Sequence, residues 1–171
     1  LVDSRMKEIF PCVNTEKVLK ESYADGKVLV KSKSKYGVIN SNGSYVLPLE
    51  FNSIKRERRR FMVSKASGYG LYTDEGKEII PCTFKNIKQQ LGYWLCCSND
   101  GLWGVYTSDF DELYPCQFQD VSLHMNNGKL MLYNKNKGLW GAIDFYAGTE
   151  LLPNNYSSID FKSYKGVGDF Y

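Results

Sequence analysis

Four copies of an aromatic–glycine dipeptide recur along the chain at a nearly constant interval. Successive aromatic residues lie 33, 34 and 37 positions apart. One hairpin alone could not bury such a ring, because a two-stranded hairpin is marginally stable by itself. A regular period of this length therefore predicts tandem supersecondary units that bury their apolar faces against one another. The four dipeptides are Tyr36-Gly37, Tyr69-Gly70, Trp103-Gly104 and Trp140-Gly141.

Three further residue types recur at fixed positions in every repeat, and we call each such position a column. The positions are counted from a proline that follows two apolar residues, as in "VLP" or "IIP". The third residue after each proline is aromatic and the sixth is β-branched. Columns of different residue types thus keep fixed offsets, which chance explains poorly. An orphan proline, Pro11, is followed by Asn14 in place of the aromatic residue, as suits an atypical capping unit. The columns are Pro48, Pro81, Pro115 and Pro153; Phe51, Phe84, Phe118 and Tyr156; and Ile54, Ile87, Val121 and Ile159.

Each unit is expected to hold about three short strands. A hairpin turn is predicted at Asn42-Gly43, where both residue types tolerate positive φ. Matching turns are predicted at Glu75-Gly76 and near Ala147-Gly148, whereas the third unit lacks a glycine there and predicts a loop of another type. Segments such as "RFMVSK", "GYWLCCS" and "GKLMLYN" supply the remaining strand.

These patterns predict an all-β chain whose units are stacked in an elongated or curved array. The alternative is a small closed β-propeller, although blades usually need four strands and about 40 residues. Each large ring is expected to fill the gap between neighbouring units, while the adjacent glycine allows backbone or ring to approach closely. The chain is read as one domain, 1–171, with a partial cap at 1–33 and repeats at about 34–66, 67–100, 101–137 and 138–171.

The combined pattern resembles the bacterial WG-repeat family, also called KWG repeats. "GLWGVY" and "GLWGAI" match its glycine–x–tryptophan–glycine–aliphatic segment, and "SGYGLY" and "SKYGVI" match with tyrosine in place of tryptophan. The resemblance covers residues 36–161 well and residues 9–30 loosely. It implies a β-rich repeat module that mediates contacts and is often attached to other domains, and it supplies no catalytic residues.

One cluster of charge stands out against an otherwise nearly neutral chain of net charge +3. The run "KRERRR" at 55–60 holds five cations and one anion, and it directly follows the β-branched residue Ile54. It is therefore expected in a loop before the strand "RFMVSK". A basic patch there could bind phosphate, nucleic acid or an acidic protein surface, while a merely solvated loop is the plainer interpretation. The candidate anion-binding residues are Lys55, Arg56, Arg58, Arg59 and Arg60.

The sequence offers no catalytic constellation, and we expect neither an enzyme nor a cofactor. His124 is the only histidine, is expected in a loop, and has no serine or cysteine partner at a recognisable spacing. The cysteine count is odd and no C-x-x-C motif occurs, so free thiols are favoured over a metal site or a disulfide framework. The five cysteines are Cys12, Cys82, Cys96, Cys97 and Cys116.

The expected function is a noncatalytic module for protein–protein interaction or scaffolding, with another protein as the partner. The alternatives are a carbohydrate- or nucleic-acid-binding repeat module, or an accessory domain of a larger enzyme. No apolar run is long enough to span a membrane, and a cytoplasmic location is favoured while a removed N-terminal signal stays open. The C-terminal stretch "FKSYKGVGDFY" is a candidate for a final strand.

Overall fold

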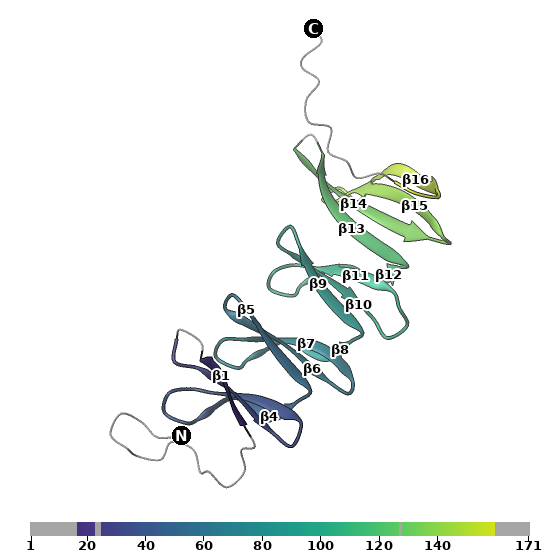
Figure 1. The fold of residues 1–171 in the computed structure, drawn as a ribbon. Coiled ribbons are helices and arrows are strands. Elements are labelled where there is room, and N and C mark those ends of the chain that lie inside the picture. The colour runs from purple at the N-terminus through teal and green to yellow at the C-terminus, as the bar shows by residue number, and fades with distance from the viewer. Residues whose placement is uncertain (1–16, 23–24, 127, 160–171) are drawn as a thin grey trace. The chain divides into compact units, whose positions relative to one another are not determined.

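The computed structural model describes residues 17–22, 25–126 and 128–159, with side chains from residue 25 onward (Figure 1). Over these ranges the chain forms sixteen strands and no helix. The strands make four antiparallel sheets of four strands each, which confirms the predicted all-β fold. Predictions made for Pro11, Cys12, Asn14 and the stretch 161–171 concern positions outside the described residues.

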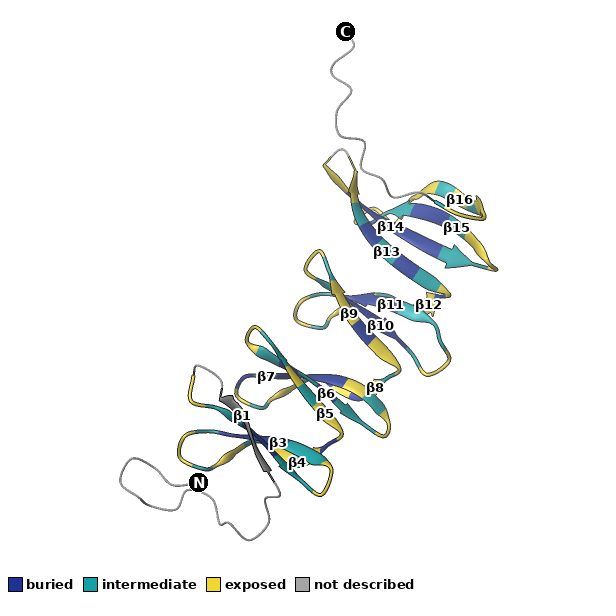
Figure 2. Cartoon of the chain, viewed as in Figure 1, coloured by how far each residue is buried: buried dark blue, intermediate teal, exposed yellow. Residues whose placement is uncertain are grey.

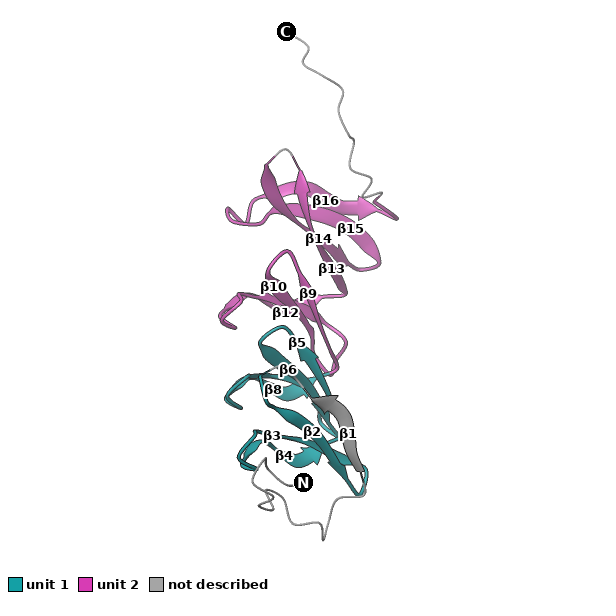
Figure 3. Cartoon of the chain, turned by 60° about the vertical axis from the view of Figure 1, so that its left-hand side comes forward, with its two compact units in different colours: residues 1–84 teal, residues 85–171 magenta. Residues whose placement is uncertain are grey.

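The chain divides into two compact units, residues 1–84 and residues 85–171, coloured teal and magenta in Figure 3. Unit 1 holds two sheets, and in each of them consecutive strands are neighbours. Sheet 1 contains β1 (Lys17–Ser22), β2 (Val28–Ser32), β3 (Lys35–Ile39) and β4 (Tyr45–Phe51). Sheet 2 contains β5 (Ser53–Glu57), β6 (Arg60–Lys65), β7 (Gly68–Thr73) and β8 (Glu78–Phe84).

Unit 2 repeats this plan with its own two sheets, each again a meander of consecutive strands. Sheet 3 contains β9 (Asn86–Gln90), β10 (Tyr93–Cys97), β11 (Trp103–Tyr106) and β12 (Glu112–Phe118). Sheet 4 contains β13 (Asp120–Asn126), β14 (Lys129–Asn136), β15 (Leu139–Asp144) and β16 (Glu150–Tyr156).

Each sheet holds four strands, one more than the approximate number of three predicted for each repeat. The strand that the prediction omits is the first of each sheet, which in sheets 2, 3 and 4 is β5, β9 or β13. Each of these is an edge strand, and most of its side chains are polar and in contact with water. The hydrophobic signal is therefore weak. With four strands per sheet, the main argument against propeller blades, that the units hold too few strands, no longer stands.

The boundaries of the sheets do not coincide with the boundaries predicted for the sequence repeats. The boundaries expected at about 34, 67, 101 and 138 fall between the second and third strands of a sheet. The β-branched residue that closes one sequence repeat belongs to the first strand of the next sheet, as Ile54 in β5 and Val121 in β13 illustrate. One sequence repeat thus contributes to two successive sheets.

The aromatic–glycine dipeptide and the proline strand are cross-strand partners, and this explains their fixed spacing. In sheet 1, Tyr36 lies opposite Phe51, the aromatic residue that follows the proline. Two positions further along β3, Val38 lies opposite Leu47, so that β4 carries a bulge around its proline. The same shift occurs in the other sheets, where the aromatic pairs are Tyr69 with Phe84, Trp103 with Phe118 and Trp140 with Tyr156.

The bulge requires the glycine. A Cβ added to any of the four dipeptide glycines would lie 2.7–2.9 Å from a backbone oxygen of the proline strand, well inside van der Waals contact. The proline tolerates its position because the fourth strand is an edge strand and the bulge interrupts the ladder, so that its missing N–H costs no hydrogen bond. A bulky ring therefore stands beside glycine because the bulged backbone crosses directly over that glycine.

The third hairpin turn is of the same type as the first two, contrary to expectation. In the second turn, Thr73 N–H donates to Lys77 O and Gly76 N–H donates to Thr73 O, at 2.8 and 3.0 Å. The third turn repeats both bonds at 2.9 and 3.1 Å between Thr107 and the stretch 110–111. Phe110 takes the place of the glycine at a φ of 72°, and its ring stacks on a neighbouring ring 4.5 Å away between centroids.

Each unit has a core that joins its two sheets. The buried residues appear as dark blue segments of the strands in Figure 2. In unit 1 the strictly buried residues Val38, Leu47 and Phe51 of sheet 1 share a cluster with Phe61 and Val63 of sheet 2. In unit 2 a second cluster combines residues of sheets 3 and 4: Leu95, Val105, Phe118, Val121, Leu123, Leu130, Leu132 and Phe145. Aliphatic residues and phenylalanines thus fill most of both cores.

The dipeptide rings lie at the margins of this packing rather than at its centre. Tyr36 and Trp103 are half-buried against the cores of units 1 and 2. Trp140 packs on a separate cluster of sheet 4, and Tyr69 is 41% exposed. The expectation that these rings fill the gap between neighbouring units therefore overstates their burial.

Candidate binding pocket

The basic run does not form a loop of free cations. Lys55 and Arg56 lie on β5, while Arg58 and Arg59 occupy the hairpin turn that leads into β6. Lys55 pairs with Glu57 at 2.8 Å, and Arg60 is the first residue of β6. The loop prediction thus holds only for the turn itself. Binding of an anion by this run stays a prediction.

Arg56 is engaged in a charged network inside unit 1. Its guanidinium donates two hydrogen bonds of 2.7 Å to the Asp25 carboxylate and reaches Asp74 at 2.9 Å. The bonds from Arg56, followed by those from Lys27, hold the pKa of the Asp25 carboxyl well below its usual range. Because this guanidinium already serves two carboxylates, Arg56 connects sheet 1 to sheet 2 and is the least available of the candidate anion-binding residues.

The described cysteines are free thiols, and three of them are buried. Burial raises the pKa of Cys96 to about 12 and also raises that of Cys82 and Cys97. Thiols of this kind are poor nucleophiles at neutral pH. Cys116 is half-buried in the bulge of β12. The described residues contain no group of three or more His, Cys, Asp or Glu side chains that could hold a metal ion.

His124 lies on strand β13 rather than in a loop, and it has a serine neighbour that the sequence did not suggest. Its Nε2 is 2.9 Å from Ser122 Oγ, two residues away on the same face of the strand. Gln90 also reaches this face: its amide donates to Leu123 O at 2.8 Å and accepts from Leu123 N–H at 3.0 Å. Burial lowers the pKa of His124. The serine–histidine contact thus belongs to the joint between sheets 3 and 4.

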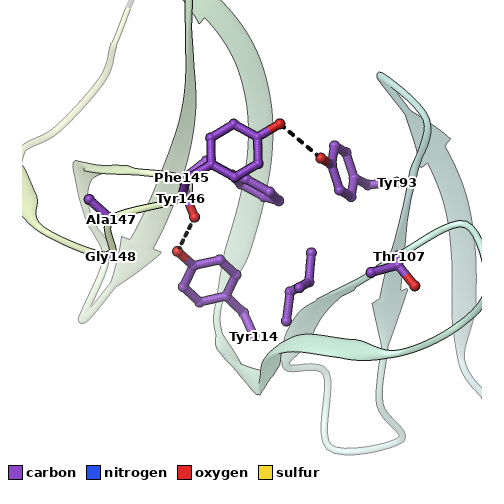
Figure 4. Close-up of a pocket in the computed structure, with 8 residues that line it drawn as sticks. Tyr93, Thr107, Tyr114, Phe145, Tyr146, Ala147 and Gly148 are labelled. Carbon is purple, nitrogen blue, oxygen red and sulfur yellow. Dashed lines mark hydrogen bonds between the residues drawn. The ribbon is translucent and has the colours of Figure 1, made fainter.

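A pocket of about 440 Å³ lies at the same joint of unit 2 (Figure 4). Tyr93 at the start of β10 and Tyr114 on β12 form one side, and the turn between β15 and β16 forms the other. Tyr114 donates to Phe145 O at 2.7 Å, and the hydroxyls of Tyr93 and Tyr146 are 3.1 Å apart. The lining residues are Tyr93, Thr107, Leu113, Tyr114, Phe145, Tyr146, Ala147 and Gly148.

The walls of this pocket are aromatic but partly open to water. Phe145 is buried at 4% exposure and contacts the rings of Tyr93 and Tyr114, with centroids 4.7 and 5.7 Å apart. Tyr146, in contrast, is 77% exposed. The hydrogen bond between Tyr93 and Tyr146, together with burial, raises the pKa of Tyr93. The site therefore presents fixed rings below and a solvated tyrosine at its mouth, and its lining contains no charged side chain.

A single extra residue creates the space. The interval from dipeptide aromatic to proline is 12 residues in the first three copies but 13 from Trp140 to Pro153. In unit 1 the shorter turn between β7 and β8 places Gly76 against Val46. A Cβ on this glycine would collide with the Val46 carbonyl. In unit 2 a Cβ on Gly148 would meet no atom within 4 Å. The longer turn thus leaves a hollow where the equivalent turn of unit 1 is tightly packed.

Sequence reasoning missed this site, although a signal was present. The residues proposed as a binding patch, 55–60, lie in unit 1, whereas the pocket lies wholly in unit 2. The sign that could have located it is the departure of the fourth repeat from the 12-residue interval, combined with the aromatic pair Phe145 and Tyr146 in its turn.

Comparison with solved structures finds proteins of low similarity. Hsv2 from Kluyveromyces lactis is 11% identical, with a TM-score of 0.39, over 76% of this chain and 45% of that chain. The computationally designed Ika8 protein is 12% identical with a TM-score of 0.37, over 75% and 46%. The WD40 β-propeller domain of Doa1 is 17% identical with a TM-score of 0.33, over 75% and 50%. These scores are too low to carry an inference, and the chain spans about half of each structure or less.

No curated protein matches the chain. The described residues contain no helix long and apolar enough to cross a membrane. Residues 36–58 match the family model described as "WG containing repeat". That match begins at the first aromatic–glycine dipeptide, and the same proline bulge and the same aromatic pairing recur in all four sheets. Residues 36–58 are therefore similar to a WG repeat, which supports the resemblance that the sequence pattern indicated.

Proposed function

We propose that this protein is a noncatalytic module that binds another protein through the aromatic pocket of unit 2. The observation that carries the proposal is the exposed Tyr146 at the mouth of a pocket whose inner rings are fixed. Tyrosine is enriched at the energetic centres of protein interfaces because it offers a large rigid surface and a hydroxyl. Leu113, also in the lining, is 42% exposed and adds apolar area at the rim.

The chemistry of the described residues supports binding rather than catalysis. The thiols with shifted pKa values are shifted upward, away from the reactive thiolate. The Ser122–His124 contact lies outside the lining of this pocket. Noncatalytic binding therefore accounts best for a pocket lined by rings, hydroxyls and backbone.

Site-specific photo-crosslinking tests the proposal. A photoreactive phenylalanine analogue replaces Ala147, which is exposed and lines the pocket, in the full chain within cells of the source organism. The matched control carries the analogue at Leu139, which is exposed in the same unit but outside the pocket. We expect protein adducts at position 147 in clear excess over position 139, and competition by untagged chain. Equal labelling at both positions, or adducts with glycan or nucleic acid alone, would refute it.

A further inference from the structure

The pocket is built from two stretches of chain that contain carboxylates and no Lys or Arg. The lining residues of one wall lie within residues 93–114 and those of the other within residues 144–150. The carboxylates in these stretches are Asp100, Asp109, Asp111, Glu112, Asp144 and Glu150. The chain as a whole carries a net charge of +3, so this absence of cations is a local feature.

Several of these carboxylates flank lining residues directly. Glu112 precedes Leu113, and the turn that ends at Gly148 begins after Asp144 and is followed by Glu150. Asp109, Asp111, Glu112 and Glu150 are exposed. The negative charge of Asp144 contributes, after burial, to a raised pKa of Tyr114 in the wall. The rim is thus acidic while the lining itself is uncharged.

Asp144 also holds the longer turn in place. Its Oδ1 accepts hydrogen bonds from the backbone N–H groups of Tyr146 and Ala147, at 3.1 and 2.9 Å. Its backbone carbonyl accepts from Gly148 N–H at 2.9 Å. The wall that carries the exposed ring is therefore positioned before any ligand arrives, which reduces the entropic cost of binding.

We propose that the aromatic pocket receives an arginine or lysine side chain from a basic segment of the partner protein. This inference rests on the proposed function and specifies the chemistry of the partner. The aromatic faces of the lining attract a cation, and the aliphatic stem of Arg or Lys packs on the same rings. The acidic rim favours a basic segment over an acidic one and accelerates its approach.

In unit 1, the junction between the two sheets contains a cation from the chain itself, the guanidinium of Arg56. There, Arg56 occupies the region between sheets 1 and 2, and its guanidinium carbon lies 5.5 Å from the centroid of the Phe61 ring. Asp25 and Asp74 complete the pairing. In unit 2 the positions of Arg56 and Phe61 are taken by Leu123 and Leu132, which are buried in the core. Lys88 reaches Val121 O at the joint between sheets 3 and 4, but no Lys or Arg lines the pocket. Unit 1 thus shows that a guanidinium can pack on a ring and pair with carboxylates between two sheets of this fold.

Titration calorimetry with capped glycine–serine hexapeptides tests this proposal on the full chain. The peptides carry two central arginines, lysines, leucines or glutamates. We expect binding of the arginine and lysine peptides, weakened by salt, and none of the glutamate peptide. Tyr146→Leu should weaken arginine-peptide binding about fivefold, while Tyr146→Phe, which keeps the ring, should stay within about twofold. Tyr45→Leu, at an exposed tyrosine of unit 1, is the matched control and should change nothing.

Three results would overturn the inference. The leucine peptide could bind as tightly as the arginine peptide, tetramethylammonium alone could match the arginine peptide, or no peptide could bind. The first result would leave the proposed function intact, because the pocket would still bind protein through an apolar side chain. The crosslinking experiment decides the proposed function separately, since it does not depend on the charge of the partner.

Discussion

Replacement of Gly104 by alanine tests the central structural claim, that the dipeptide glycine exists to let the proline bulge cross over it. The new Cβ would lie 2.8 Å from Tyr114 O, 2.9 Å from Cys116 N and 3.0 Å from the carbonyl carbon of Pro115. All three are backbone atoms, so no side chain can rotate away to relieve the contact. Overpacking costs about 1–3 kcal/mol, and the entropic gain of alanine over glycine offsets about 0.4–1 kcal/mol of this. We expect a net loss of about 1–2 kcal/mol.

Tryptophan fluorescence during urea denaturation measures this loss in the correct unit, because all three tryptophans, Trp94, Trp103 and Trp140, lie in unit 2. Gly138→Ala is the matched control: its Cβ meets no atom within 4 Å, but its φ is +81°. It should cost only the left-handed backbone penalty of about 1 kcal/mol. If Gly104→Ala proves neutral or stabilising, or costs less than the control, the bulge does not explain the glycine.

Three further predictions concern a turn, a charged network and the thiols. Phe110→Gly should change the free energy of unfolding by less than about 1 kcal/mol, because it loses the ring stack but relieves the positive φ. Phe110→Ala loses the stack and keeps the positive φ, so it should destabilise by about 1 kcal/mol in the same assay. The depressed pKa of Asp25 means that its carboxylate stabilises the fold fully above the ordinary value of 3.8 and loses this contribution as pH falls towards the lowered value. Arg56→Gln should therefore raise the pKa of Asp25 in an NMR titration, and an unchanged pKa would contradict the pairing. In native alkylation with peptide mapping, Cys116 should react before Cys96, whose buried thiol has a pKa of about 12; labelling in the reverse order would contradict the assigned burial.

The sequence was sufficient to predict the repeat, because its columns record contacts that every sheet must make. The aromatic pairs across the third and fourth strands, such as Tyr36 with Phe51, appear in the sequence as a fixed offset. The role of the glycine in a close backbone approach was also predictable from the size of its neighbour. These features depend on local register, which a periodic pattern reports directly.

The remaining features depend on side chains that the pattern does not constrain. Strands β5, β9 and β13 escaped prediction because each is an edge strand with few buried residues, such as Val121 and Leu123 of β13, and most of its other positions are polar. Phe110 at a glycine position is stabilised by a ring stack that no propensity anticipates. The pocket depends on one inserted residue in a turn, whose effect on the space between two sheets becomes visible only once both sheets are placed.

The offset between sequence repeat and sheet has a consequence for how such a chain can grow. Only one residue, Asn52, Lys85 or Gln119, separates the last strand of each sheet from the first strand of the next. A duplicated block of one period therefore restores complete four-stranded meanders wherever its ends fall, because the severed strands at one end are matched by those at the other. A gene segment that encodes one period can therefore be gained or lost with its ends at any position in the repeat. A single irregular copy, like the one that carries Phe145, can then acquire a binding site while the neighbouring repeats preserve the fold.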